Sequence, residues 1–577
     1  MYENDLAYKG DAPVNWCDSC KTVLANEQVV EGLCERCDST VSQKNLNQWF
    51  FRISEYSDEL LESLNTLGDW PDSVKSMQKN WIGKSQGALV NFKLAKSNES
   101  VEVFTTRPDT LYGATYMVIS PEHPLLSNYD LYKKEDIKKY CDKATKKSEL
   151  QRTDLDKNKT GVFTNLYAIN PITDTKIPIW IADYVLMSYG TGAIMAVPGH
   201  DERDHEFAKK YKIDIIKVVD DGNNISVDES AFTEDGIAVN SKIIEGLNTK
   251  DAIQKMIGFL KDNNLGNPSI TYRLKDWLIS RQRYWGTPIP IVYDPDGKAH
   301  PIPEEHLPWI LPDDVEYKPK GTSPLGSSKE LIERTETLFG KGWRPEIDTM
   351  DTFVCSSWYY MRYPDANNNT KPFSKESTSW LPVDHYVGGS EHATMHLLYA
   401  RFVTKALYDL GYVDFEEPFK HLYHQGTITK DSAKMSKSKG NTVSPDIFID
   451  KFGSDTFRCY LMFMGPYNEG GDWNDKGIKG IDKFLSRTWR LFYQESDYKE
   501  SDEDLYIIHS TIRRVTENLD SMKFNTALSR LMEFVNHFYS KGLNDNIKYI
   551  YIQLLASFAP HLAEELWSTK FNESVFI

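Results

Sequence analysis

Two Cys-x-x-Cys pairs near the start of the chain constrain its fold more tightly than any other feature. Cys17 and Cys20 form the first pair, Cys34 and Cys37 form the second, and thirteen residues separate the pairs. Each pair can make a tight turn that presents two thiolates to one metal ion, which gives a tetrahedral site of four sulfurs. The alternative is a set of disulfides, which a reducing cytosol disfavours. We therefore predict a structural Zn²⁺ site that holds a small ribbon together and has no open position for chemistry.

Length and composition set the scale of the molecule. A chain of 577 residues, 40% of them hydrophobic, can bury several cores, so we expect about three or four domains. The net charge of −17 does not exclude nucleic acid, because an acidic protein can still bind it through a local basic face. The chain has no apolar run long enough to cross a membrane, and its acidic start lacks the apolar core of a leader. We expect no membrane contact and a cytoplasmic location.

The pattern of apolar residues changes along the chain and marks candidate domains. From about 83 to 270, short strands such as Ala88–Phe92 and Val101–Phe104 predict a compact mixed domain. Glycine, proline and lysine cluster between 294 and 345, which predicts a surface excursion with little regular structure. After 475, apolar residues recur at helical spacing and predict a helical domain.

A basic, hydroxyl-rich string is a candidate polyphosphate loop. It reads Lys434-Met435-Ser436-Lys437-Ser438 and continues as Lys439-Gly440-Asn441. The lysines supply positive charge, the serines supply donors, and the loop closed by Gly440 and Asn441 lets the backbone approach a ligand. These groups would neutralise charge on a transferring phosphoryl group. A solvated surface loop is the alternative interpretation.

A strand–glycine–helix unit precedes this loop. The strand is predicted to end in Gly388 and Gly389, and a helix is predicted over 391–412. Such a unit can bring a ribose and the backbone close together. His392 and His396 lie four positions apart and would share one face of the helix. A metal site is one interpretation of this pair, but no third ligand suggests itself.

Two polar strings fall within the mixed domain. They are Thr105-Thr106-Arg107-Pro108-Asp109-Thr110 and Gly199-His200-Asp201-Glu202-Arg203-Asp204. Taken alone, the first is an ordinary strand end and turn, and His200-Asp201 could cap a helix. Their presence together in one domain favours a functional site.

Six strings in a fixed order carry a resemblance to a known family. They are Asn15-Trp16-Cys17, Thr105 to Gly113, Gly190 to Ala193 with Gly199 to Asp204, Asp276 to Gly286, Gly388 to His392, and Lys434 to Ser438. The last string matches the KMSKS signature of class I aminoacyl-tRNA synthetases. On all six, the chain resembles bacterial-type leucyl-tRNA synthetases over essentially its whole length. The valine and isoleucine enzymes share the Trp-Gly and KMSKS regions, whereas the Thr-Arg-Pro-Asp-Thr and Pro-Gly-His-Asp strings are typical of the leucine branch.

The resemblance implies an α/β multidomain fold built around a class I Rossmann-like catalytic domain. This partial catalytic domain would cover 51–82 and 271–474, with a zinc ribbon over 1–50 and a mixed α/β editing domain over 83–270 as insertions. A truncated helical anticodon-binding domain would cover 475–577.

The resemblance also implies roles for the polar strings. A pocket distinguishes side chains that differ by a methylene by only about 1–3 kcal/mol, so a second site that hydrolyses mischarged tRNA supplies the missing selectivity. Thr110 matches the residue that sterically rejects the leucyl side chain, and Asp204 matches the carboxylate that grips the free α-amino group. The implied editing site also contains Thr105, Thr106, Arg107, Asp109, His200 and Asp201. A water molecule oriented by these groups and by the substrate's ribose hydroxyl would hydrolyse the ester.

For the synthetic reaction, the resemblance implies leucine, ATP with Mg²⁺, and tRNA-Leu as ligands. Lys437 would stabilise charge on the pyrophosphate side, and Lys434 would assist. The ATP site would comprise Lys434, Met435, Ser436, Lys437, Ser438, Gly388, Gly389 and Glu391. Glu391, His392 and His396 would line the pocket for leucine and its adenylate.

One class I motif does not occur in these 577 residues. It is the His-x-Gly-His string, whose imidazoles stabilise the α-phosphorus during adenylate formation. His421-Leu422-Tyr423-His424 has its outer spacing but lacks the glycine, and is predicted to be a strand. The family's C-terminal tRNA-binding domain is missing as well. We therefore expect amino-acid activation to need an N-terminal polypeptide that carries the missing motif.

Three functions remain open from the sequence. The first is an incomplete leucine–tRNA ligase with hydrolytic editing. The second is a stand-alone hydrolase that clears mischarged tRNA-Leu, and the third is a non-catalytic tRNA-binding relative. Intact Thr110 and Asp204 permit the second, but the intact KMSKS string argues against such specialisation. Degraded strings would be expected for the third, so the first is favoured.

Overall fold

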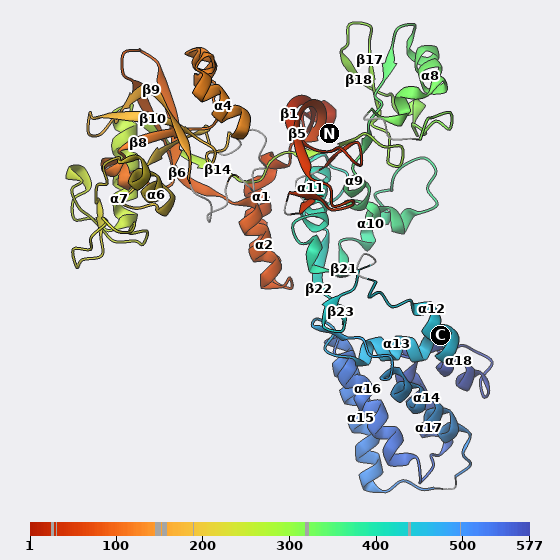
Figure 1. Cartoon of the computed structure of the whole chain (residues 1–577). Helices are drawn as coiled ribbons and strands as arrows, with labels where there is room; N and C mark the ends of the chain where they lie inside the picture. Colours follow the sequence, from red (N-terminus) through yellow and green to blue (C-terminus); the bar gives the residue numbers. More distant parts are fainter. Residues whose placement is uncertain are drawn as a thin grey trace. The chain divides into compact units, whose positions relative to one another are not determined.

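The computed structural model of the chain contains two compact units (Figure 1). The first comprises Met1–Gly68, Lys75–Leu381 and Thr394–Pro418, and the second comprises Asp69–Val74, Pro382–Ala393 and Phe419–Ile577. The structure describes residues 1–24, 28–30, 32–144, 152, 159–187, 190–317, 322–436, 440–496 and 498–576. Within these ranges, no helix combines the length and the apolar character that a membrane crossing requires.

A long two-stranded ribbon opens the first unit. Strand β1 (Ala7–Cys17) pairs with β5 (Val41–Phe51) in antiparallel register from Ala7↔Phe51 to Cys17↔Val41. Strands β2 (Thr22–Leu24) and β15 (Trp277–Leu278) extend this pair into a four-stranded sheet. The short strands β3 (Val29–Val30) and β4 (Leu33–Cys34) form a hairpin beyond β2. Cys17 ends β1 and Cys34 ends β4, so both cysteine pairs begin where a strand ends.

A mixed α/β domain follows helix α2 (Asp72–Ile82). Its seven-stranded sheet has the order β11-β8-β10-β9-β6-β14, and β7 pairs with β6. The strands are β6 (Ser85–Leu94), β7 (Ser100–Thr105), β8 (Tyr116–Ile119), β9 (Gly161–Ile169), β10 (Lys176–Ala182), β11 (Ala193–Ala196) and β14 (Gly266–Thr271). The main helices are α4 (Glu135–Ala144), α6 (Glu202–Tyr211) and α7 (Thr249–Asp262). The first strand, β6, pairs with the last, β14, from Ser85↔Thr271 to Val90↔Gly266. The chain therefore enters and leaves the domain at neighbouring points.

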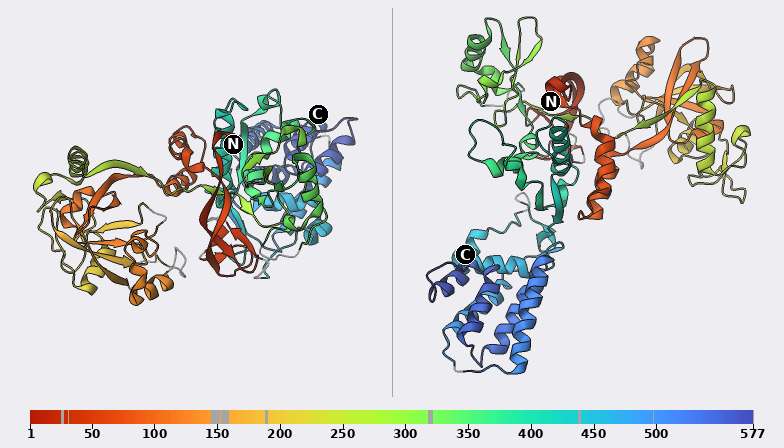
Figure 2. Two further views of the ribbon diagram at one scale, coloured as in Figure 1. Left: turned by 90° about the horizontal axis from the view of Figure 1, so that it is seen from above. Right: turned by 180° about the vertical axis from the view of Figure 1, so that it is seen from behind.

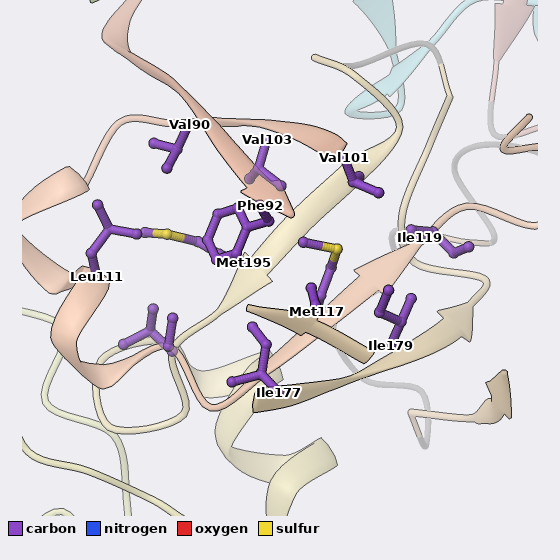
Figure 3. Close-up of a cluster of buried hydrophobic side chains, with 14 of the residues drawn as sticks. Val90, Phe92, Val101, Val103, Leu111, Met117, Ile119, Ile177, Ile179 and Met195 are labelled. Carbon is purple, nitrogen blue, oxygen red and sulfur yellow. The ribbon is translucent and has the colours of Figure 1, made fainter. Parts of the chain in front are cut away.

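Alternate residues of neighbouring strands build the core of this domain. Phe92 of β6 and Val103 of β7 meet Met195 of β11, and Leu111 reaches the same cluster from the 3-10 turn η5, which spans Pro108–Gly113 (Figure 3). Alternation with a period of two is what a strand with one buried face requires. The strands predicted at 88–92 and 101–104 are confirmed.

The prediction of little regular structure between 294 and 345 is wrong. Strands β17 (Ile291–Tyr293), β18 (Ala299–Pro301) and β19 (Arg344–Pro345) form a sheet, and α8 (Lys329–Phe339) packs with them in a small core. The helix begins where the Ser328 hydroxyl oxygen accepts the backbone N–H of Leu331 at 2.9 Å. Leu331 then faces the core. Turn-forming residues on both sides of α8 hide its short periodic stretch in the sequence.

The second unit combines short strands with a helical bundle. The strands are β21 (Val383–Gly388) and β22 (Phe419–His424), which are parallel, and β23 (Thr427–Lys430), β24 (Ala433–Lys434) and β25 (Gly470–Asp472), which form a second sheet. The helices are α12 (Pro445–Phe452), α13 (Ser454–Phe463), α14 (Ile478–Tyr493), α15 (Asp502–Asp520), α16 (Phe524–Phe538), α17 (Asp545–Ala556) and α18 (Pro560–Ser568). Helices α15 and α16 run side by side (Figures 1 and 2). The helical prediction after 475 and the strand predicted at 421–424 are confirmed.

The helix predicted over 391–412 begins later than expected. Ser390–His392 form the 3-10 turn η12, and α11 runs only from His396 to Asp409. Met395 has φ −109° and ψ −104°, outside the helical region, and this residue separates the two elements. His392 and His396 therefore do not share one helical face, and the interpretation as a metal-binding pair loses its basis.

Arg401 joins segments that lie on both sides of the inserted domain. The side chain is completely buried in α11, and its Nε and Nη2 donate to the two carboxylate oxygens of Glu417 at 2.8 and 2.9 Å. Its remaining donors reach the Gln78 side chain in α2, the Ser63 hydroxyl and the Leu60 carbonyl. Residues 60–78 precede the insertion, whereas 401–417 follow it. The guanidinium of Arg401 thus forms hydrogen bonds with segments that precede and follow the inserted domain.

Replacing Arg401 by leucine should destabilise the first unit by up to about 3–5 kcal/mol, because Glu417 would stay buried with only Lys405, 3.3 Å from its Oε1, to offset its charge. Urea unfolding followed by tryptophan fluorescence would measure the change. The matched control is Lys570→Met, which removes an exposed 2.8 Å ion pair with Asp545 and should cost at most about 1 kcal/mol. Equal losses from both variants would contradict the role given to Arg401.

Candidate active sites

The first polar string folds into a turn that fixes the orientation of Thr110. Strand β7 ends at Thr105, whose hydroxyl oxygen accepts the backbone N–H of Arg107 at 3.0 Å. In η5, the backbone N–H and the hydroxyl of Thr110 both donate to the Arg107 carbonyl, at 3.1 and 2.9 Å. Thr110 is only 2% exposed. Because the turn itself uses the hydroxyl, the methyl group is what Thr110 can present to a neighbouring side chain.

Arg107 and Asp109 form an ion pair across the same turn. Nε of Arg107 lies 3.0 Å from Oδ1 of Asp109, and Nη2 lies 2.9 Å from Oδ2. Asp109 is buried, whereas Arg107 stays partly exposed and Thr106 is exposed. The pair leaves a guanidinium at the surface of the turn, where it can meet an anion.

The second string forms the N-terminus of α6. Asp201 is the N-cap, and its Oδ1 accepts the backbone N–H groups of Arg203 and Asp204 at 2.9 and 3.1 Å, which confirms the helix-cap interpretation. Asp204 is buried in the first turn, and its Oδ2 accepts the backbone N–H of Val197 at 2.8 Å. Burial, and then the charge of Asp201, raise the pKa of Asp204 well above its usual value. A cationic amine placed against this carboxyl would favour its ionised form.

His200 is held by the backbone at both ring nitrogens. Its Nδ1 lies 2.8 Å from the carbonyl oxygen of Phe232, while Nε2 lies 2.8 and 3.0 Å from the backbone nitrogens of Val218 and Val219. A carbonyl can only accept and a backbone N–H can only donate, so the ring is neutral with its proton on Nδ1. Burial lowers the pKa of His200 and favours the same form. His200 therefore anchors the segment from 218 to 232.

The two strings come together in the folded domain. The charges of Arg107 and Asp109 both act on the ring of His200. Gly113, at the end of η5, packs so closely on Val197 that an added Cβ would lie 3.2 Å from its Cγ1. Val197 in turn donates to Asp204. The turn that carries Thr110 thus packs against Val197, whose backbone bonds to Asp204 at the start of α6.

In the second unit, the predicted nucleotide-binding residues lie at the carboxyl ends of parallel strands. Gly388 ends β21 opposite His424 of β22, and the charges of Glu391 and His392 both act on His424, whose pKa is lowered first by burial. This edge of a parallel sheet is where α/β proteins bind ligands. The Glu391 carboxylate folds back over Gly389, so a Cβ at this position would require the carboxylate to move. His396, predicted for the same pocket, belongs to the first unit and contacts Tyr359.

Asn441 bridges the predicted polyphosphate loop. Its side-chain oxygen accepts the backbone N–H of Ser436 at 2.8 Å, and its amide nitrogen donates to the carbonyl of Lys434 at 3.2 Å. Gly440 has a φ of +65°, which glycine adopts readily. Met435 packs against the helical core of the second unit. The prediction that Gly440 and Asn441 close the loop is confirmed, whereas Lys437 and Ser438 lie outside the described residues.

The four paired cysteines converge on one point. All four sulfurs lie within 4.8 Å of one another, with Cys17 and Cys37 at 3.4 Å and Cys20 and Cys34 at 4.0 Å. A disulfide would need a sulfur–sulfur distance of about 2.0 Å. Sulfurs around a tetrahedral zinc stand about 3.8 Å apart, given zinc–sulfur bonds of about 2.3 Å. Among the described residues these cysteines are the group that could hold a metal ion, and their spacing fits one.

Comparison with known proteins decides the family. Residues 79–261 match the model of the leucyl-tRNA synthetase editing domain, residues 1–90 and 264–473 match tRNA synthetases class I (I, L, M and V), and residues 505–577 match the anticodon-binding domain of tRNA ligase. The leucine–tRNA ligase of Clostridium tetani (strain Massachusetts / E88) is 51% identical over 593 residues, which cover 98% of this chain and 72% of that protein. The chain belongs to the leucyl-tRNA synthetase family.

Other members of the family give the same picture. The leucine–tRNA ligase of Clostridium perfringens (strain 13 / Type A) is 49% identical over 602 residues, covering 100% of this chain and 73% of that protein. The crystal structure of the Agrobacterium radiobacter K84 agnB2 LeuRS in ternary complex with tRNA and LeuAMS has a TM-score of 0.84 and 35% identity, and the match covers 100% of this chain and 72% of that one. This leucyl-tRNA synthetase family member thus spans 72–73% of the length of these relatives. Its class I synthetase fold with editing and anticodon-binding domains is as predicted.

Two supporting side chains of the editing domain were not predicted from the sequence. The Tyr116 hydroxyl donates to the Asp204 carbonyl at 3.1 Å, and its ring stacks on Phe207. Asn170 is completely buried and contacts η5. Neither lies in a polar string: Tyr116 stands in an apolar strand and Asn170 precedes a proline, so they look like ordinary core and turn residues.

The neutral His200 ring predicts a pH dependence of stability. The folded pKa lies below the usual 6.5, so the stabilisation is complete above about 6.5 and is lost as the pH falls through the folded pKa. Protonation puts a second proton on Nε2, facing two backbone donors, while Arg107, Asp109 and Lys217 set the surrounding charge. His200→Ala should flatten the pH dependence of the unfolding free energy below about pH 6.5.

Urea unfolding at several pH values would measure this dependence. The matched control is His509→Ala in α15, where the side chain is exposed and the wild-type dependence should persist. A wild-type dependence that survives in His200→Ala would contradict the anchoring role.

Proposed function

We propose that this chain performs the reactions of a leucine–tRNA ligase: ATP-dependent formation of leucyl-adenylate, transfer of leucine to tRNA-Leu, and hydrolysis of mischarged tRNA. Membership of the leucyl-tRNA synthetase family supports all three reactions. The observation that carries the editing reaction is the link from the Thr110 turn to Asp204 through Val197, which packs under Gly113 and donates its backbone N–H to the Asp204 carboxyl.

In editing, Asp204 holds the free α-amino group of the aminoacyl ester. The carboxyl is buried and already accepts one backbone N–H, so an incoming ammonium meets it with little water around and favours its ionised form. The methyl group of Thr110 would meet the branched leucyl side chain and so exclude the correct product. Arg107, fixed by Asp109, is positioned for the terminal adenosine and its phosphate. Thr105, Thr106, His200 and Asp201 shape this site, and an oriented water attacks the ester carbon.

In synthesis, the loop from Lys434 to Ser438 contacts the triphosphate of ATP. Bound Mg²⁺ would neutralise charge on the phosphates. Lys434 and Lys437 supply mobile positive charge on the pyrophosphate side, and Met435 and Asn441 hold the loop in place. We assign Glu391 and His392, beside Gly388 and Gly389, to adenylate, and we assign His396 to leucine.

The cysteine cluster holds one structural Zn²⁺. Cys17, Cys20, Cys34 and Cys37 would occupy all four tetrahedral positions, so the ion would stabilise the tip of the β1–β5 ribbon and do no chemistry. The convergence of four sulfurs supports this assignment. We propose four domains along the chain. They are the ribbon over 1–50, the catalytic domain over 51–82 and 271–474, the editing domain over 83–270, and the helical domain from 475.

Asp204→Ala should abolish hydrolysis of isoleucyl-tRNA that carries the leucine anticodon, because the amino group loses its anchor. Asp204→Asn tests the charge alone, since it keeps the shape and should also lose at least about a hundredfold in rate. Deacylation of labelled isoleucyl-tRNA would measure both variants. Glu202→Gln, in the same turn and exposed, is the control and should keep full activity. Unchanged hydrolysis by Asp204→Asn would rule out the amino-group anchor.

Thr110→Ala should let the site cleave correct leucyl-tRNA, because the excluding methyl group is gone. Thr110→Ser removes the methyl but keeps the hydroxyl bond to Arg107, so it should act in the same direction, by about tenfold or more. Thr110→Val keeps the branched shape and should continue to spare leucyl-tRNA. If leucyl-tRNA survives in both the alanine and the serine variants, the steric role is wrong.

Metal analysis of the purified chain should find about one zinc per chain, as a closed four-sulfur site holds a single ion. Replacing Cys17 and Cys20 with serine should remove it. Cys355→Ser is the control, because this exposed cysteine lies outside the cluster and its loss should leave the metal content unchanged. Zinc retained after loss of Cys17 and Cys20 would contradict the assignment.

A further inference from the structure

The turn that carries Thr110 is buried along its whole length. All six residues of η5, Pro108–Gly113, are buried, as is Ala114 at its C-terminal end. The last carbonyl groups of a helical turn have no partner within the turn and ordinarily bond to water. The Leu111 carbonyl accepts the backbone N–H of Ala114 at 3.2 Å. Water cannot freely reach its second lone pair or the Ala114 carbonyl, so a donor from the protein must serve them.

Asn170 supplies that donor from a different part of the sheet. Its Nδ2 donates to the Leu111 carbonyl at 2.8 Å and to the Ala114 carbonyl at 3.4 Å. Leu111 directly follows Thr110. The side chain of Asn170 is 0% exposed, so no water competes for these bonds.

The rest of the Asn170 amide is fixed by its own turn. Asn170 stands between β9 and β10, and its Oδ1 accepts the backbone N–H groups of Ile172 and Thr173 at 3.0 and 3.4 Å. Its backbone N–H donates to the Thr175 carbonyl at 2.9 Å, which closes the hairpin. The amide nitrogen is therefore held at one position by the hairpin and aimed at η5.

Thr110 is thus held from both sides. On the N-terminal side, its backbone N–H and hydroxyl bond to the Arg107 carbonyl. On the C-terminal side, Asn170 fixes Leu111 and Ala114. A shift of less than a methyl radius at Thr110 would change the space offered to a leucyl side chain, and packing decides differences of one methylene.

We propose that Asn170 is a positioning residue for editing: it sets the place of Thr110 and thereby the rejection of leucyl-tRNA. The inference rests on the proposed steric role of Thr110. An amide is required because one group must accept two N–H donors and donate to carbonyl oxygens at once. A carboxylate at this position could still accept the two N–H groups but could not donate to the carbonyl oxygens.

The test compares deacylation of leucyl-tRNA and isoleucyl-tRNA by the full chain. Asn170→Asp keeps the acceptor for Ile172 and Thr173 but places negative charge against the two carbonyls, so η5 should relax. The ratio of kcat/KM for leucyl-tRNA to that for isoleucyl-tRNA should rise by about tenfold, the scale of one methylene. Asn170→Ala, which adds no charge, is the second variant and should shift the ratio in the same direction.

Thr173→Val is the matched control. It removes a 2.7 Å side-chain bond to Thr175 from the same hairpin turn without touching η5, so the ratio should stay at the wild-type value. General destabilisation lowers both rates together and leaves the ratio unchanged, and a thermal melt of each variant would monitor it. If Asn170 acts through Thr110, adding Asn170→Asp to Thr110→Ala should raise leucyl-tRNA hydrolysis no further.

The outcomes separate this inference from the proposed function. A raised ratio in Asn170→Asp or Asn170→Ala, absent in Thr173→Val, supports the positioning role. A raised ratio in Thr110→Ala together with wild-type ratios in both Asn170 variants overturns it, while the steric role of Thr110 stands. Wild-type ratios in all of these variants overturn both.

Discussion

Burial of the Arg401 guanidinium is the constraint on which the discontinuous first unit depends. A charge removed from water must find partners for every donor, and those partners come from residues 60 to 78 on one side and from Glu417 on the other. Hydrophobic contacts alone tolerate sliding, whereas five directed hydrogen bonds do not. The chain can therefore leave this core for a whole domain and return to it in register.

The same physical rule shapes the editing domain on a smaller scale. Segments without regular pairing are buried there, and side chains take over the role of water: Asp201 caps α6, His200 anchors the segment from 218, and Asn170 supports η5. Each of these side chains makes at least two bonds to backbone groups. The residues proposed for chemistry, Thr110 and Asp204, inherit their positions from this framework.

Local features were predictable from the sequence, and long-range ones were not. The cysteine spacing, the strands at 88–92 and 101–104, and the closure of the loop by Asn441 depend on neighbours in the chain. Helix α8 was missed because its short apolar pattern is surrounded by turn formers. A three-residue turn that ends at the non-helical Met395 separates His392 from His396. Arg401 and Asn170 find partners 16 to 341 and 56 to 59 positions away. Periodicity carries no information about such pairs.

The pairing of β6 with β14 has a consequence for how such a chain can change over evolutionary time. Neighbouring strands stand about 4.8 Å apart, so the two points where the host is interrupted are nearly one point. A short loop could join them with little loss of chain entropy. A proofreading module attached in this way can be acquired, discarded or exchanged as a block, while the host that makes the product keeps its own path.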